Sequence, residues 1–110
     1  MVGIDIIKID RFRGFRREEY GFWRNVFTHD EWGGAFASAF PARRLAGVFA
    51  CKEAVMKAVG SSYLGRFDKI SVNSDTSGKP FVRLSDDDVE VSVSISHEKE
   101  YAVAFAIKIN

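Results

Sequence analysis

The stretch RLAGVFACKEAVMKAV, residues 44–59, decides how this chain folds. At 3.6 residues per turn, its large apolar side chains fall on one stripe of a helix and small residues occupy the opposite side. Such a helix is expected to have neighbours on both sides. A narrow polar wedge holds Glu53 and Lys57, while Lys52 lies within the apolar stripe. Charges on so buried a helix are costly unless they are paired, solvated in a cleft or bound to a ligand. This helix is therefore a candidate functional site.

The composition predicts one globular domain spanning residues 1–110. Hydrophobic residues make up 46% and charged residues 28% of the chain, which is ordinary for such a domain. A formal net charge of +1 gives no whole-molecule attraction to nucleic acid or to a membrane. A lone cysteine cannot form an internal disulfide, so we expect a reducing, cytoplasmic location. We see neither a signal-peptide pattern nor an apolar run of the roughly 18 residues that would span a membrane.

The order of the expected elements indicates an α+β fold, with an antiparallel sheet packed against the long central helix. Three helical patterns stand before most of the strands: residues 17–23, a short helix capped by Thr28 with Glu31 in a capping box, and the long helix between Pro41 and Gly60. An apolar strand precedes them at residues 2–9. Four further strands are expected at residues 69–73, 80–84, 89–96 and 101–109, with turns at 75–78 and 97–100.

Several polar residues have both an ordinary and a functional interpretation. Asp5 lies in a strand of large aliphatic residues, where a carboxylate either faces water at the strand end, pairs with an arginine or serves a site. Glu53 and Lys57 are an i,i+4 pair in the stabilising order. Lys52 could extend its ammonium past the apolar groups to water. His97 ends a strand, where a surface histidine is common. The residues alone leave these alternatives open.

Three motifs carry a resemblance to a known family. The segment FACKEAVMKAVG (residues 49–60) resembles the FAAKEAxxKAxG helix of the holo-acyl-carrier-protein synthases, the small bacterial class of 4′-phosphopantetheinyl transferases. VGIDIIKIDR (2–11) is similar to their GIDIVEIxR strand, and SVSISH (92–97) is similar to their VSISH strand. Thr28, Glu31 and the SGKP turn (77–80) also follow the family's order, so the resemblance covers nearly the whole chain.

The resemblance implies a metal site and a catalytic lysine. Asp5 and Glu53 match the family's Mg²⁺ ligands, and Mg²⁺ is typically held by one or two protein carboxylates together with substrate phosphate oxygens. Lys57 matches a residue counted among the catalytic ones. The base that takes the substrate proton is open between Glu53 and a water molecule.

The resemblance also implies the binding partners. Five residues match positions near coenzyme A: Lys52, Lys79, Pro80, Ser96 and His97. Among them, His97 and its serine neighbourhood match positions at the phosphates. The family assembles as homotrimers with sites at the interfaces, so a second subunit is expected to contribute to each site.

The arginines early in the chain have two interpretations. Arg11 matches a position that contacts the acidic helix of the acyl carrier protein in related enzymes. Aromatic residues alternate with these arginines, however, and such a pattern also occurs in RNA-binding surfaces that stack bases. A non-catalytic module binding RNA or a carrier protein is therefore one alternative.

Four positions depart from the family pattern. Lys8 stands where the family commonly has a glutamate, and Asn25 where it often has a basic residue. Val48 replaces a common arginine, and Ser61-Ser62 replace the usual Thr-Gly. They bear on the choice of carrier protein and on coenzyme A affinity. A family member that binds coenzyme A without turnover is the second alternative.

The sequence thus predicts an enzyme that transfers 4′-phosphopantetheine from coenzyme A to a serine of an apo-acyl carrier protein. Mg²⁺ would neutralise the diphosphate, and adenosine 3′,5′-bisphosphate would leave. No nucleic acid or membrane partner is expected. The sequence does not identify the carrier protein, nor whether acyl-coenzyme A is accepted.

Overall fold

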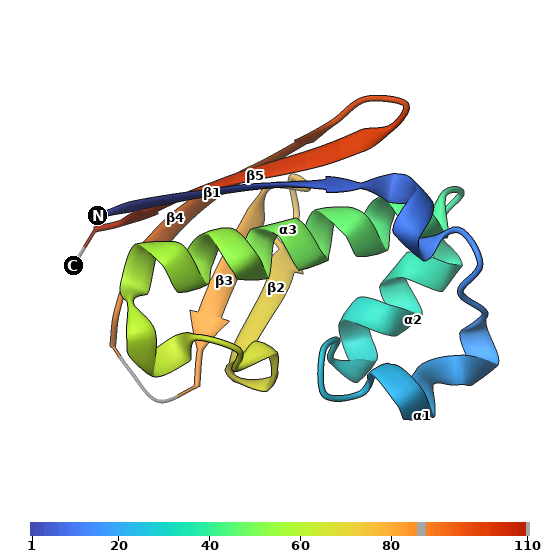
Figure 1. The fold of residues 1–110 in the computed structure, drawn as a ribbon, viewed down its shortest axis with the longest axis horizontal. Helices are drawn as coiled ribbons and strands as arrows, with labels where there is room; N and C mark the ends of the chain where they lie inside the picture. Colours follow the sequence, from blue (N-terminus) through green and yellow to red (C-terminus); the bar gives the residue numbers. More distant parts are fainter. Residues whose placement is uncertain (86–87, 110) are drawn as a thin grey trace.

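The computed structural model describes residues 1–85 and 88–109, which form two antiparallel sheets around one long helix (Figure 1). The larger sheet has the strand order β1-β5-β4, and the smaller sheet pairs β2 with β3. The strands are β1 (Val2–Lys8), β2 (Ile70–Ser74), β3 (Pro80–Leu84), β4 (Val91–His97) and β5 (Tyr101–Lys108). The helices are α1 (Tyr20–Trp23), α2 (His29–Ala37) and α3 (Pro41–Val59), with 3-10 turns at Ile9–Phe12, Arg17–Glu19, Ser61–Tyr63 and Phe67–Lys69. The predicted α+β fold with a long central helix is confirmed.

Helix α3 has neighbours on both sides, as its sequence predicts. Pro41 begins it, where the missing N–H costs no hydrogen bond. Gly60 follows it with a φ of 107°, a left-handed backbone conformation that favours glycine. The sheet of β1, β5 and β4 packs on one side of α3, and α2 and β2 contact it elsewhere. None of the described helices is long and apolar enough to cross a membrane.

The small residues let the sheet approach α3 closely. Ala102, Ala104 and Ala106 of β5 are fully or almost fully buried. At Gly3 of β1 the approach is closest, because a Cβ atom there would lie 1.9 Å from the carbonyl oxygen of Ala54. This contact fixes β1, and with it Asp5 two residues later, against the middle of α3.

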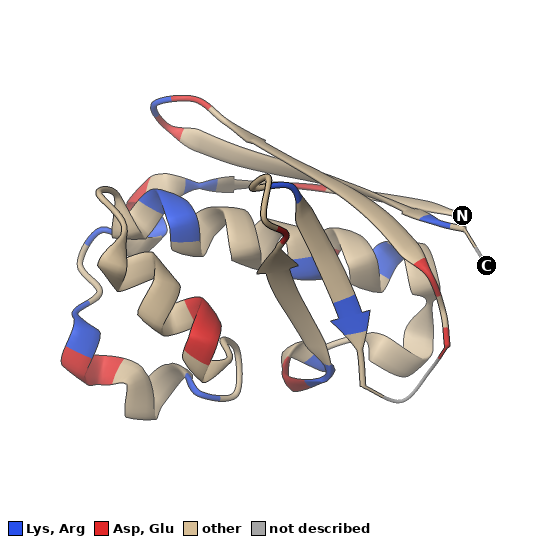
Figure 2. Ribbon diagram, turned by 180° about the vertical axis from the view of Figure 1, so that it is seen from behind, with Lys and Arg blue, Asp and Glu red and all other residues tan. Residues whose placement is uncertain are grey.

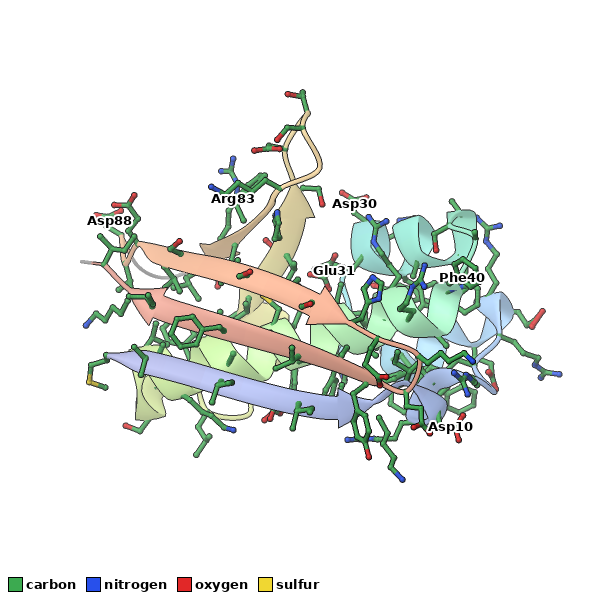
Figure 3. The ribbon with its side chains drawn as sticks, turned by 90° about the horizontal axis from the view of Figure 1, so that it is seen from above. Asp10, Asp30, Glu31, Phe40, Arg83 and Asp88 are labelled. Carbon is green, nitrogen blue, oxygen red and sulfur yellow. The ribbon has the colours of Figure 1, made fainter. Side chains whose placement is uncertain are left out.

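The opposite face of the larger sheet is apolar and open. Because side chains alternate along a strand, the residues of β1 and β5 that do not face α3 point to this second face. The large apolar residues among them are exposed: Val2, Ile4, Ile6, Phe105 and Ile107. Figure 3 looks onto this face and shows no other element of the described chain lying over it.

The element boundaries differ from the expected ones in a few places. The capping box of α2 is confirmed, since Thr28 Oγ1 accepts the Glu31 N–H at 3.0 Å and Glu31 Oε1 accepts the Thr28 N–H at 2.8 Å. Residues 17–23, expected as one helix, divide into a 3-10 turn and the short α1. Strand β4 begins at Val91 rather than at residue 89, and β1 ends at Lys8.

Candidate active site

Asp5, Glu53 and Lys57 meet where β1 lies against α3. Lys57 Nζ donates to the carbonyl oxygen of Ile4 at 2.9 Å and to Asp5 Oδ1 at 3.3 Å. The ion pair of Lys57 is therefore with Asp5 across the β1–α3 contact, and not with Glu53 along the helix as the i,i+4 interpretation expected. Because β1 is an edge strand of its sheet, this cluster lies at the border of the chain.

The electrostatics of Glu53 indicate two carboxylates in close proximity. Partial burial raises the pKa of Glu53, and the negative charge of Asp5 raises it further, while Lys57 and Arg11 oppose the shift. Two neighbouring carboxylates with only partial compensation favour binding of a cation. The described residues contain no group of three or more His, Cys, Asp and Glu side chains suited to a metal. Two carboxylates nevertheless fit Mg²⁺, which keeps several water ligands and requires few from the protein.

Arg11 lies beside this carboxylate pair. It belongs to the 3-10 turn that follows β1, and its guanidinium carbon is 5.1 Å from the ring centre of Phe49 and 5.8 Å from that of Phe12. Its charge also lowers the pKa of Glu53. Arg11 is exposed, so it can contact a partner while its charge still acts on Glu53.

Lys52 has a structural role here, in contrast to the expected contact with coenzyme A. Its side chain is fully buried, and its ammonium pairs with Glu31 Oε1 at 2.7 Å. It also donates to the carbonyl oxygens of Val26 at 2.8 Å and Phe67 at 3.2 Å. With these three acceptors every ammonium hydrogen has a partner inside the protein. Lys52 can be buried in the core rather than exposed to a ligand because its pairing with Glu31 offsets the cost of burying the charge.

Glu31 is a residue whose role the sequence did not reveal. Beyond the capping box, its Oε2 accepts the backbone N–H of Val72 in β2 at 2.7 Å. With Lys52, it joins α2, α3 and β2 through one buried ion pair. The only sequence signal was Lys52, a charged residue in the apolar stripe of α3. Such a residue requires a partner of opposite charge, but the pattern does not identify that partner.

The residues expected near coenzyme A divide between two places. His97 and Pro80 line a cleft of about 610 Å³ bounded by α2, the first half of α3, the β2–β3 sheet and the end of β4. Ser96 and Lys79 are exposed and are not among the residues that line it. The backbone N–H of Lys79 donates to Asp75 Oδ1 at 3.0 Å, which holds the turn before β3.

The carboxylate pair and the cleft lie on opposite flanks of α3. Glu53 belongs to the first, and Arg44 lines the second. Glu53 follows Arg44 by nine residues, a separation that rotates a helix by about two and a half turns and so places the two side chains on opposite sides. Likewise β1 and β4 are the two edges of the larger sheet. One chain therefore does not bring His97 together with Asp5 and Glu53.

The aromatic residues among the early arginines mostly face inward. Phe12 is 3% exposed, and Phe15 stacks on Trp23 with ring centres 4.4 Å apart. Rings that pack against each other are not free to stack on bases, which argues against the RNA-binding alternative. Phe22 differs, since it is 84% exposed on α1.

Comparison with known proteins agrees with this fold. Residues 1–106 match the sequence profile of the 4′-phosphopantetheinyl transferase superfamily. A holo-[acyl-carrier-protein] synthase of Alkaliphilus metalliredigens is 37% identical, with 96% of this chain and 95% of the relative covered. The same enzyme of Chlorobaculum parvum is 40% identical, with 96% and 95% covered.

Solved structures are similar as well. The holo-[acyl-carrier-protein] synthase of Helicobacter pylori in complex with coenzyme A superposes with a TM-score of 0.81 at 28% identity, covering 98% of this chain and 99% of that one. The enzyme of Bacillus anthracis in complex with CoA (3′,5′-ADP) gives a TM-score of 0.80 at 35% identity, covering 97% and 93%. From the carboxylate pair, the fold and these matches, the chain belongs to the 4′-phosphopantetheinyl transferase superfamily and, within it, to the holo-[acyl-carrier-protein] synthases.

Proposed function

We propose that this enzyme transfers 4′-phosphopantetheine from coenzyme A to a serine of an apo-acyl carrier protein in a Mg²⁺-dependent reaction. The observation that carries the proposal is the meeting of Asp5, Glu53 and Lys57 at the β1–α3 contact. The serine oxygen attacks the phosphorus that bears the pantetheine, the bond to the bridging oxygen of the diphosphate breaks, and adenosine 3′,5′-bisphosphate leaves.

Asp5 and Glu53 would hold the Mg²⁺. When bound, the ion would neutralise negative charge on the diphosphate as the P–O bond breaks. Lys57 keeps Asp5 oriented through its hydrogen bond and adds positive charge beside the transferred group. The serine proton would pass either to Glu53, which is half-buried at the same place, or to a water molecule.

The acyl carrier protein would dock beside this cluster. Arg11 is exposed next to Glu53 and can attract an acidic helix. Phe22 of α1 offers an apolar contact on the same segment of the chain. Docking there would bring the carrier serine to the carboxylate pair.

The active form would be a homotrimer with shared sites. Val2, Ile4 and Ile6 are 59%, 59% and 63% exposed on the open sheet face, an apolar patch of the kind that subunit contacts usually cover. A second subunit would also join the cleft of one chain, with His97, to the carboxylate pair of its neighbour. The cytoplasmic location expected from the sequence stays a prediction.

The test is incubation with coenzyme A, Mg²⁺ and a panel of apo-carrier proteins, read by intact mass. The expected result is the addition of one phosphopantetheine to a carrier, lost when EDTA is added. Binding of coenzyme A without any mass gain across the panel would favour the non-catalytic family member. Native mass spectrometry of the same sample gives the subunit number, and a monomer at working concentration would refute the trimer.

A further inference from the structure

Glu53 stands between two residues of α3 that are anchored on nearly opposite sides of the helix. Lys52, directly before it, is fully buried and pairs with Glu31 of α2. Ala54, directly after it, carries the carbonyl oxygen that strand β1 approaches at Gly3. Two positions rotate a helix by about 200°, so Glu53 lies between these contacts, about 100° from each. Figure 2 shows the same arrangement, with the acidic first turn of α2 in red below α3 and β1 above α3.

The anchor at Lys52 holds its ammonium group from three directions. Nζ donates to Glu31 Oε1 at 2.7 Å and to the carbonyl oxygens of Val26 at 2.8 Å and Phe67 at 3.2 Å. These acceptors come from α2, from the segment before α2 and from the 3-10 turn before β2. The carbon stem of Lys52 is buried as well, so close packing determines its path. A rotation of α3 would therefore break contacts with three separate segments.

Glu31 is itself held in place, so it cannot follow a rotation of α3. Its Oε1 also accepts the Thr28 N–H at 2.8 Å, and its Oε2 accepts the Val72 N–H at 2.7 Å. Both donors are backbone groups, one at the start of α2 and the other in β2. The ion pair is thus a rigid link between α3 and the elements that pack on its side away from β1.

The carboxylate pair requires such a link. Mg²⁺ demands nearly ideal octahedral geometry, with oxygen ligands at about 2.0–2.1 Å. Side chains reach about 5–6 Å from the axis of a helix, so a rotation of α3 by about 20° would displace the Glu53 carboxylate by about 2 Å. Asp5 belongs to β1 and would not move with α3. Such a displacement is as long as the metal–oxygen bond itself, so the two carboxylates could no longer share one ion.

We propose that the buried ion pair of Lys52 with Glu31 positions the carboxylate pair. By fixing the rotation of α3, it holds Glu53 at the angle at which Glu53 shares a divalent cation with Asp5. This inference rests on the proposed function, in which the two carboxylates bind Mg²⁺. Lys52 is fully buried, so it acts through Glu53 rather than by touching a substrate.

The test removes the ion pair without leaving a buried charge. Replacing both partners of a buried ion pair by uncharged side chains is often neutral for stability, whereas removing one partner is strongly destabilising. In the double variant Lys52→Met/Glu31→Gln, methionine occupies the space of the lysine stem, and glutamine can still form the capping box with Thr28. The urea midpoint of this variant should therefore stay close to that of wild type.

The readout is the binding of Mn²⁺, which takes the same oxygen ligands as Mg²⁺ and can be followed by electron paramagnetic resonance without any substrate. The double variant should bind Mn²⁺ about ten- to a hundredfold more weakly than wild type, the usual effect of losing a group that orients a metal ligand. In the transfer assay kcat should fall by a similar factor. The KM for the carrier should change little, because Arg11 belongs to the separate 3-10 turn after β1. Wild-type affinity for Mn²⁺ in the folded double variant overturns the proposal.

Cys51→Ala is the matched control for a loss of stability. Cys51 precedes Lys52 in α3 and is fully buried, but it takes no part in the ion pair. Alanine should lower the urea midpoint through the lost core volume, and should leave the Mn²⁺ affinity and kcat unchanged. A loss of Mn²⁺ affinity as large as that of the double variant would show that a general loosening of the core suffices, and would overturn the proposal.

A second variant, Glu31→Asp, decides the question if the double variant does not fold. It keeps both charges, but its side chain is one methylene shorter. Lys52 then cannot reach the carboxylate and both carbonyl oxygens at once unless α3 turns. The Mn²⁺ affinity should fall several-fold, and a folded Glu31→Asp variant with unchanged affinity overturns the proposal.

Mn²⁺ binding also separates this proposal from the proposed function. Affinity that is lost in the double variant supports the positioning role even if no carrier is modified. Transfer by wild type with an equal kcat in the double variant refutes the positioning role and leaves the transferase activity standing. A wild-type protein that binds no Mn²⁺ refutes the shared cation, and this proposal with it.

Discussion

The contact between Gly3 and α3 makes a sharp prediction about stability. In Gly3→Ala the added methyl group would lie 1.9 Å from the carbonyl oxygen of Ala54 and 2.9 Å from the backbone nitrogen of Ala58, whereas real Cβ atoms keep at least 3.0 Å. Both neighbours are helix backbone, which cannot rotate away as a side chain could. Strand β1 must therefore move away from α3 by about 1 Å.

The expected loss is about 3 kcal/mol in the free energy of unfolding, the upper end of the usual range for overpacking. At about 4 °C per kcal/mol for a domain of this size, the Tm should fall by roughly 12 °C. Transfer should also weaken in the folded variant, because the shift separates Asp5 from Glu53. Urea denaturation at one fixed protein concentration measures the first effect.

Gly33→Ala is the control for this substitution. Gly33 lies within α2, and a Cβ atom there would meet nothing within 4 Å. Alanine should stabilise that helix by about 0.5–1 kcal/mol. The two variants make the same chemical change with opposite expected signs. A Gly3→Ala variant as stable as wild type would refute the argument that the β1–α3 approach permits no side chain.

Four further predictions address the site and the core. Asp5→Ala and Glu53→Ala should each abolish nearly all transfer without unfolding the protein, and the double variant should lose little more; losses that multiply would speak against a shared ion. Arg11→Glu should lower kcat/KM for the carrier about tenfold or more at low salt and change the coenzyme A kinetics little. The difference between wild type and variant should narrow as the salt concentration rises. Identical carrier kinetics in the two proteins would show that Arg11 is only a surface charge. Glu53→Ala and His97→Ala subunits, mixed and shown by native mass spectrometry to exchange, should regain part of the activity, and exchange without recovery would mean that each chain builds its own site. Burial raises the pKa of the Cys51 thiol to about 12, so the folded protein should resist thiol reagents. The free energy of unfolding should decline as the pH rises above about 8.5, because the thiol ionises there in the unfolded chain but not in the folded one. Labelling of Cys51 at the rate of a free cysteine would contradict this.

The sequence predicted the elements whose signals are local. The 3.6-residue pattern of α3, the capping box at Thr28 and the turn before Pro80 depend on neighbours within a few positions, and the structure has all of them. Lys52 pairs with Glu31, which lies 21 positions away in the sequence. The apolar pattern around Lys52 therefore indicated that the charge needs a partner, but it could not identify which residue this is. The same holds for Arg44, whose place in the cleft follows only from how α2 and β4 pack.

The site was predicted through the motifs rather than through physical reasoning on single residues. The resemblance connected Asp5 with Glu53, and the structure brings them into electrostatic contact. The resemblance did not separate Lys52 from the other residues expected at coenzyme A, because burial of one helix face depends on tertiary packing. It did imply a site shared between subunits, and within one chain His97 and the carboxylate pair lie on different flanks of α3.

The buried Lys52 also determines which alignment of α3 against its neighbours the chain can adopt. The close contact at Gly3 fixes where β1 lies along α3, and the buried ion pair of Lys52 with Glu31 fixes the rotation of the helix. A shift of one residue rotates the helix by about 100°. Lys52 would then leave Glu31, and an unpaired buried charge costs about 3–5 kcal/mol. Misaligned intermediates are thereby disfavoured during folding. The same rotation of α3 orients the next residue, Glu53, towards Asp5.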